Sequence, residues 1–328
     1  MKALAKNPAL LLSAYMIGAV LLGALLAPLI YKIGHDVIAG AIREFRVADT
    51  PPFGYLYKVL ETSDFQRYFN RAFLLAALIC LWPFSKILKL QRSDFAFGEN
   101  PRRLNDLLTG LLVAALPLLA LGACLELANV YSYRESIDWS KALTRATTTA
   151  AGVSLMEEFF FRGALFALLL RSLRTTSALW FLSVFFAAVH FLKPPGHLDI
   201  AAADITWTTG FWLAGQVFLN FSNPTFLLAE FTTLLAVGLI LGIARLRTKS
   251  LWLPIGLHAG WVFGIFFFRG LATGSNATKA GEHLPWIGEN LKTGLLPLLV
   301  VALTALLLFK GLRPKSKSNP VPTPEADH

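Results

Sequence analysis

The sequence predicts an all-α, polytopic membrane protein of about eight transmembrane helices with additional interfacial helices. Two observations carry this prediction. Of the 328 residues, 55% are hydrophobic and 15% are charged, against roughly 25% charged residues in an ordinary soluble domain. The apolar residues also gather in runs close to the roughly 20 residues that a helix needs to cross a bilayer. This composition excludes a disordered chain and a soluble nucleic-acid-binding domain.

Eight runs have the length and composition of a membrane span. They are residues 9–31, 72–90, 104–130, 142–170, 176–192, 224–244, 251–269 and 293–311. The first run follows Lys2 and Lys6 and is too long for the hydrophobic region of a signal peptide, so we expect an uncleaved anchor. The net charge of +10 gathers at the ends of the runs, where basic residues set topology and contact lipid headgroups. Their density in short loops predicts that both chain ends face the cytoplasm.

Two connecting segments are also predicted to lie at the membrane surface. In segment 32–71, Val37, Ile38 and Ile42 recur at helical spacing among charged residues, which is typical of an interfacial amphipathic helix. Segment 193–223 is rich in aromatic residues, and we expect it to lie in the interface or to dip into the membrane.

The predicted organisation has four parts. They are N-terminal helices in residues 1–139, a core in residues 140–270, a last transmembrane helix in residues 271–312, and a charged, proline-rich and disordered tail in residues 313–328.

Adjacent carboxylates, Glu157 and Glu158, interrupt one apolar run, and Arg162 follows them. An ionised group near the bilayer midplane costs about 3 kcal/mol or more, so such residues usually face the bundle interior and carry function. Glu158 stands four residues before Arg162, the favoured spacing for a helical ion pair, whereas Glu157 is rotated by about 100° around the helix. We therefore predict that Arg162 neutralises Glu158 and that Glu157 is available as a general base. The alternative is a structural ion pair beside a protonated, inert Glu157.

Two histidines, His190 and His258, lie within or at the end of other apolar runs. A lone intramembrane histidine is usually a hydrogen-bonding structural residue, but two beside paired glutamates predict metal ligands or proton carriers. Glu157, His190 and His258 form either a zinc site or a metal-free acid–base set. Gly256 and Gly260 flank His258 at a spacing that permits close helix packing.

The other candidate residues are weaker. Cys80 and Cys124 lie inside apolar runs without a CxxC spacing, so we expect packing residues. We expect His35 and His283 to be solvated outside the spans, and His197 is a minor candidate for substrate contact.

These residues, in this order, resemble the CAAX-protease and bacteriocin-processing (CPBP) family of intramembrane endopeptidases, which includes type II CAAX prenyl endopeptidases and bacterial Abi-type immunity proteins. The three family motifs are matched in chain order by Glu157, Glu158 and Arg162, by Phe186 and His190, and by His258. The similarity covers roughly residues 140–268, under half of the chain. The resemblance implies an eight-helix fold, a site that opens within the membrane, and a glutamate-activated water that attacks a peptide bond.

One position departs from the family pattern. The third motif continues with an asparagine four residues after its histidine, and this chain has Val262 there. Valine cannot donate a hydrogen bond to an oxyanion, and loss of one such donor typically costs about a hundred- to a thousandfold in rate. Either another donor substitutes, with Asn220 and Asn223 as candidates by residue type, or the activity is low, or the chain is a non-catalytic relative.

The sequence thus predicts a multi-pass intramembrane endopeptidase of the inner membrane of a bacterium. Its partners would be the lipid bilayer and a membrane-associated, prenylated or bacteriocin-type substrate, and not nucleic acid. The predicted catalytic residues are Glu157, Glu158, Arg162, His190 and His258, and the possible cofactor is zinc on Glu157, His190 and His258. The alternatives are a non-catalytic immunity or binding relative and a proton-coupled transporter, since intramembrane Glu and His also form proton relays. The chain shows no internal repeat of the kind that transporters often have.

Overall fold

The structure is a computed structural model that describes residues 8–50, 53–61, 63–87, 91–98, 100–191, 198, 200–217 and 224–311. Almost all of its regular structure is helical, which confirms the all-α prediction. The only strands within these ranges are two of three residues each, β1 (Tyr131–Tyr133) and β2 (Ala272–Gly274), which pair antiparallel.

The α-helices follow one another along the whole described chain. They are α1 (Pro8–Tyr31), α2 (Gly40–Glu44), α3 (Phe53–Glu61), α4 (Phe65–Ile87), α5 (Arg103–Leu127), α6 (Trp139–Glu158), α7 (Phe166–Ser172), α8 (Thr175–Val189), α9 (Thr209–Gln216), α10 (Pro224–Thr248), α11 (Trp252–Leu271), α12 (Asn276–Lys279) and α13 (Leu295–Gly311). Two π-helical segments, Lys32–Ala39 and Phe159–Leu165, join α1 to α2 and α6 to α7.

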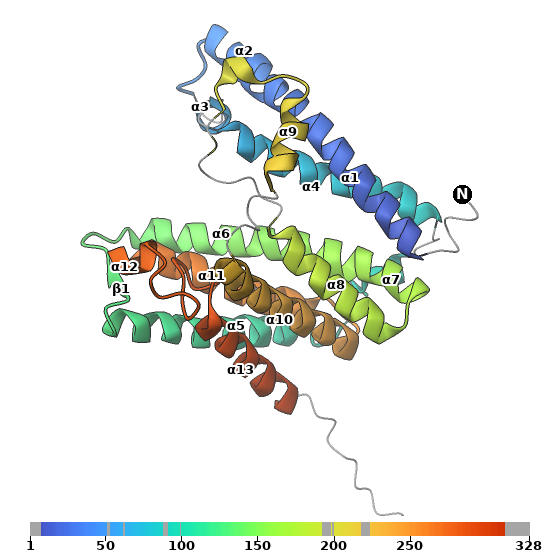
Figure 1. Ribbon diagram of the computed structural model, residues 1–328, viewed down its shortest axis with the longest axis vertical. Helices are drawn as coiled ribbons and strands as arrows, with labels where there is room; N and C mark the ends of the chain where they lie inside the picture. The colour runs from blue at the N-terminus through green and yellow to red at the C-terminus, as the bar shows by residue number, and fades with distance from the viewer. Residues whose placement is uncertain are drawn as a thin grey trace, which may run out of the picture.

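The helices form two groups (Figure 1). In the first, α1 packs against α4 and α9. In the second, α11 lies between α5 and α6, while α10 packs against α8 and α13. The groups meet where Tyr15 of α1 packs on Phe160, with ring centroids 6.4 Å apart, and joins the same buried cluster as Leu81 of α4.

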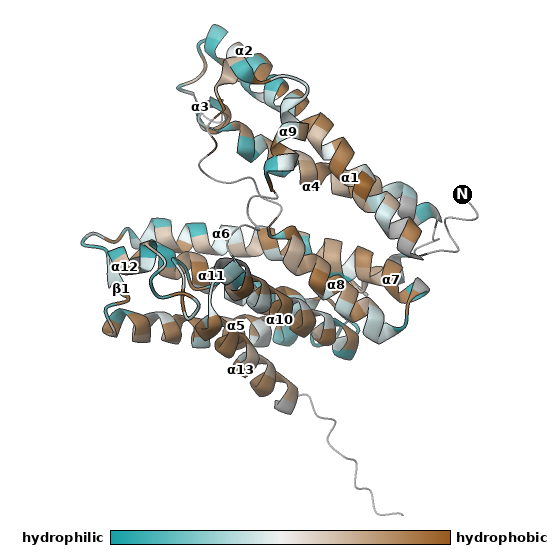
Figure 2. Ribbon diagram, viewed as in Figure 1, coloured by the Kyte–Doolittle hydropathy of each residue, from teal (hydrophilic) through white to brown (hydrophobic). Residues whose placement is uncertain are grey.

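The eight predicted spans coincide largely with helices, and apolar residues dominate most of them (Figure 2). Four helices in the described ranges are long and apolar enough to cross a membrane: Ser13–Glu44, Arg103–Leu127, Leu228–Thr248 and Trp252–Leu271. Thr175–Val189 and Leu295–Phe309 are apolar but shorter. The described part of the predicted span 72–90 lies on α4, and the span 142–170 lies on α6 through α7; these helices carry charged residues. The chain is an integral membrane protein.

The two segments predicted to lie at the surface both contain helices in their described residues. The first continues α1 without a break through Glu44, which places His35 inside a helix, partly buried against Tyr31, and not in a solvated loop. In the second, α9 packs on α1 so closely that a Cβ on Gly210 would lie 1.9 Å from the Ala24 carbonyl oxygen. The predicted disordered tail, residues 313–328, and His197 lie outside the described residues.

Glycines bring α11 into backbone contact with α5, as the spacing around His258 predicts. A Cβ on Gly256 would lie 2.2 Å from the Leu107 carbonyl oxygen, and one on Gly260 would lie 2.4 Å from the Leu111 carbonyl oxygen. Both distances are well below van der Waals contact, and the opposing atoms belong to the backbone, which cannot rotate away. Small residues therefore fix the position of the helix that carries His258.

We expect Gly256→Ala to destabilise the protein by more than the roughly 1–3 kcal/mol of ordinary overpacking, because α11 must move away from α5. The matched control is Gly152→Ala on α6, where a Cβ meets no atom within 4 Å and alanine gains up to about 1 kcal/mol of helix propensity. Thermal unfolding of the purified proteins in one detergent measures both. Equal melting temperatures for the two variants would contradict the close packing.

Candidate active site

The paired glutamates lie where α6 ends and the π-helical segment Phe159–Leu165 begins. A π-helical segment adds a residue to the turn and is frequent at functional sites because it re-aims the neighbouring side chains. Here it follows Glu157 and Glu158 directly and contains Arg162. Successive residues point in different directions, and the two carboxylates consequently have different surroundings: Glu158 is fully buried, whereas the Glu157 side chain is 22% exposed.

The predicted ion pair between Glu158 and Arg162 is present and fully buried. Arg162 Nη1 donates to Glu158 Oε1 at 2.8 Å, and Arg162 Nη2 donates to the Gly238 carbonyl oxygen of α10 at 3.4 Å. The guanidinium carbon also lies 4.2 Å from the centroid of the Phe186 ring on α8, a favourable cation–π distance. Arg162 thus ties the π-helical segment to two other helices and neutralises the deeper carboxylate.

Glu157 faces both histidines that the sequence singled out. Its Oε2 atom lies 3.9 Å from His190 Nε2 and 3.8 Å from His258 Nε2. His190 directly follows α8, and His258 lies on α11, so the fold assembles three separate segments around one carboxylate oxygen. The separations exceed direct hydrogen-bond length but suit one bridging atom.

The other nitrogen of each imidazole is held by a hydrogen-bond acceptor. His190 Nδ1 lies 2.8 Å from the Phe186 carbonyl oxygen, and His258 Nδ1 lies 2.8 Å from Glu158 Oε1. Both Nδ1 atoms therefore carry a proton and donate, so each Nε2 faces Glu157 with a lone pair in a neutral ring or with a second proton in an imidazolium. A water, a proton or a cation placed among Glu157 Oε2 and the two Nε2 atoms could bridge all three.

The donor types of Glu157, His190 and His258 suit zinc, but their spacing is wide for it. Ligands of a tetrahedral zinc lie about 2.0–2.2 Å from the metal, so that two ligand atoms are about 3.4 Å apart. The 3.8 and 3.9 Å separations here exceed that value, and no three His, Cys, Asp or Glu side chains in the described ranges form a group that could hold a metal ion. To bind zinc, the distances from Glu157 Oε2 to the two Nε2 atoms would have to shorten by a few tenths of an ångström. Zinc binding stays a prediction.

A cavity of about 380 Å³ opens next to these residues. Glu157, His190 and His258 line it, together with Val262, which lies one helical turn after His258 as the sequence predicts. Most of the remaining lining is apolar and comes from α5, α10, α11 and α13. Glu157 thus lies at the wall of a mostly apolar cavity.

Sequence reasoning missed several polar residues that line this cavity. They are Thr233, Trp261, Arg269, Asn290 and Lys292. Trp261 is a candidate hydrogen-bond donor in the cavity, because its buried indole N–H has no hydrogen-bond partner among the described residues. It lies three residues after His258, so helical spacing could have indicated that the two side chains share a face. Lys292 forms an ion pair with Glu230 of α10, and no short-range sequence pattern predicts that contact.

The remaining candidates lie away from the site or outside the described ranges. Asn220 and Asn223, proposed by residue type as replacements for the missing asparagine, are outside them. His283 lies in the segment between α12 and α13 and does not line the cavity. Cys80 and Cys124 are free thiols, one partly buried and the other exposed, so only Cys80 fits a packing role.

Comparison with known proteins agrees with the motifs. Residues 139–264 match the model of a family described as Rce1-like, type II CAAX prenyl endopeptidase. This segment contains Glu157, Glu158, Arg162, His190 and His258, and the match confirms the resemblance to the CPBP family that these residues indicated. Neither the curated proteins nor the solved structures that were compared gave a match.

Proposed function

We propose that this chain is an intramembrane endopeptidase in which Glu157 activates a water molecule for attack on a peptide bond. The observation that carries the proposal is the meeting of Glu157 Oε2 with two imidazole Nε2 atoms at 3.8 and 3.9 Å at the edge of an apolar cavity. The Rce1-like match over the same segment supports a protease acting on a peptide substrate at the membrane.

In the proposed reaction, a water lies among Glu157, His190 and His258. The water donates one hydrogen to Glu157 and the other to His190 Nε2, and its oxygen attacks the carbonyl carbon of the substrate. Glu157 takes the proton as the carbon–oxygen bond forms. The tetrahedral intermediate then collapses, and Glu157 returns the proton to the leaving amine.

His258 is the group best placed to stabilise the negative oxygen of that intermediate. Its Nδ1 contacts Glu158, which holds the ring with Nε2 toward Glu157 at the cavity. As an imidazolium, His258 would donate from Nε2 to the oxyanion.

The proposed substrate is a membrane-associated peptide, with a prenylated C-terminal tail as the first candidate and a bacteriocin-type peptide as the second. The apolar lining of the cavity and the description of the matching family support the first. We propose the inner membrane of a bacterial cell as the location. A non-catalytic immunity or binding role and proton-coupled transport are the competing functions, and neither requires turnover of a peptide.

Purified protein tested against a peptide library, with farnesylated and unmodified forms of each peptide, separates these functions. We expect cleavage that persists in the presence of a chelator, because the spacing of the three donors favours water over zinc. Loss of cleavage with the chelator and its return with added zinc would establish the metal site on Glu157, His190 and His258. Absence of cleavage by folded protein with every peptide would contradict the proposed function.

A further inference from the structure

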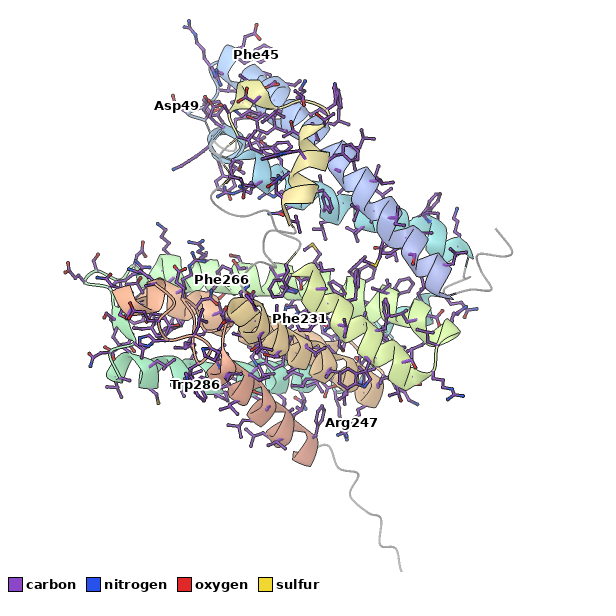
Figure 3. The ribbon with its side chains drawn as sticks, in the orientation of Figure 1. Phe45, Asp49, Phe231, Arg247, Phe266 and Trp286 are labelled. Carbon is purple, nitrogen blue, oxygen red and sulfur yellow. The ribbon has the colours of Figure 1, made fainter. Side chains whose placement is uncertain are left out.

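A second hollow, of about 390 Å³, lies between the beginning of α6 and the end of α11. Its walls carry the basic side chains of Arg134, Lys141, Arg145 and Arg269, and a single acid, Asp138. Phe266, labelled in Figure 3, lies on α11 at the boundary between this hollow and the candidate active-site cavity, and it lines both. Nothing in the proposed reaction uses the four cations.

The positive charges of this basic hollow are not neutralised by protein groups. All four basic side chains are exposed, and none of them forms an ion pair with a carboxylate in the described ranges. Asp138 Oδ1 accepts the backbone N–H of Lys141 at 2.9 Å and thereby caps α6. The N-terminus of α6 adds further positive potential. The hollow therefore carries a net charge of about +3 and attracts an anion.

The helices that carry most of these cations are in close contact. A Cβ on Gly270 of α11 would lie 2.8 Å from Cβ of Ala142 on α6, so Arg269 and Lys141, the residues next to these two, come from helices in direct contact. Arg134 Nη2 donates to the Arg269 carbonyl oxygen at 3.3 Å, which fixes its guanidinium at the rim. Glu289 lines an adjoining hollow with Arg134 and Arg269, without an ion pair to either.

The surrounding residues place the hollow at the depth of the lipid headgroups. α6 begins and α11 ends here, and exposed aromatic side chains, Tyr133 and Trp139, flank Arg134 and Lys141 in sequence. Tyrosine and tryptophan gather at this level of a bilayer because their rings are amphipathic. Ala142 and Phe266 add apolar side chains to the lining of the hollow.

We propose that the basic hollow binds the phosphate of an anionic phospholipid headgroup, with the acyl chains beside α6 and α11. Guanidinium groups form paired, charge-assisted hydrogen bonds with phosphate oxygens, and clustered lysine and arginine at the headgroup level select anionic lipids. A bound lipid would lie next to the candidate active-site cavity, because Arg269 and Phe266 line both hollows. This inference does not depend on proteolytic activity.

The test compares two double variants of equal charge. The hollow variant is Lys141→Gln with Arg145→Gln, and the control is Arg103→Gln with Lys279→Gln, whose two residues are exposed and lie outside the hollow. Native mass spectrometry of detergent-purified protein, incubated with equimolar phosphatidylglycerol and phosphatidylcholine, measures lipid retention. We expect wild type and control to retain phosphatidylglycerol preferentially. The hollow variant should lose about fivefold in this preference for each charge removed.

Two further measurements identify the source of the anion. Inorganic phosphate added to protein with phosphatidylcholine alone should not reproduce the rise in melting temperature that phosphatidylglycerol gives. Equal protection by phosphate, or equal lipid retention by all three proteins, would overturn the proposal. A third result would also overturn it: the hollow variant retains phosphatidylglycerol normally, but it no longer cleaves peptides with a free C-terminus while still cleaving amidated ones. The hollow would then recognise the carboxylate of the substrate.

Discussion

Replacing Glu157 by glutamine is expected to abolish peptide cleavage and to leave the fold intact. Glutamine keeps the size of the side chain but cannot accept a proton from water, and general-base catalysis typically contributes about a hundred- to ten-thousandfold to the rate. The Glu157 side chain is 22% exposed at the cavity, and the buried Arg162 is held directly by Glu158. Single-turnover cleavage and thermal unfolding of the same preparation measure the two effects.

Replacing Glu158 by glutamine should instead reduce stability strongly. Glu158 Oε1 accepts hydrogen bonds from both Arg162 Nη1 and His258 Nδ1, and Glu158 and Arg162 are both fully buried. Loss of one partner of a buried ion pair costs about 3–5 kcal/mol because the other charge is left uncompensated. Cleavage should also fall, since His258 Nδ1 loses the hydrogen-bond acceptor that orients its ring toward Glu157.

The comparison between the two glutamates is the informative part of this experiment. Glu282→Gln, a change at an exposed acid outside the cavity, serves as the control and should alter neither property. Equal melting temperatures for Glu157→Gln and Glu158→Gln, with full activity in the first, would show that the roles are wrongly assigned. Inactivity of both without loss of stability would mean that the Glu158–Arg162 pair contributes to chemistry and not to folding.

Local spacing predicted those parts of the site that depend on one helix. The separation of Glu158 and Arg162 predicted their ion pair, and the glycines around His258 predicted the close contact with α5. Both follow from the helical repeat and from the small size of glycine, although the pair in fact crosses into a π-helical segment that no sequence pattern indicated.

Contacts between distant segments could not be predicted in the same way. The hydrogen bond of His258 to Glu158 depends on how α11 packs against α6, and the ion pair of Lys292 with Glu230 joins a loop to α10. Apolar spans carry little information about which of their faces meet, because lipid and protein neighbours favour the same residues. For that reason the all-α membrane fold was predicted more readily than the residues that line the cavity, of which Trp261 is the clearest omission.

Restoring an amide at position 262 should raise the rate of peptide cleavage. Val262 lines the same cavity as Glu157, His190 and His258, and the resemblance to the CPBP family implies an asparagine there. Val262→Asn would supply a side-chain N–H for the developing oxyanion, and one such donor is worth about a hundred- to a thousandfold in rate. The isosteric control, Val262→Thr, adds a polar group without the longer reach of the amide.

The two outcomes for Val262→Asn lead to different views of the native site. A higher kcat with a similar KM would identify the natural protein as a weakened enzyme whose oxyanion is under-stabilised. An unchanged kcat would mean that another donor already serves, and the buried indole N–H of Trp261, which has no partner among the described residues, is the group to test by Trp261→Phe. In either case some loss of stability is expected from a polar group on an apolar helix, so activity is compared per folded molecule. Both wild type and Val262→Asn could instead prove folded but inactive against farnesylated and unmodified peptides alike. Position 262 would then not be part of a working oxyanion site. A binding or transport role would become the better interpretation of the paired glutamates and histidines.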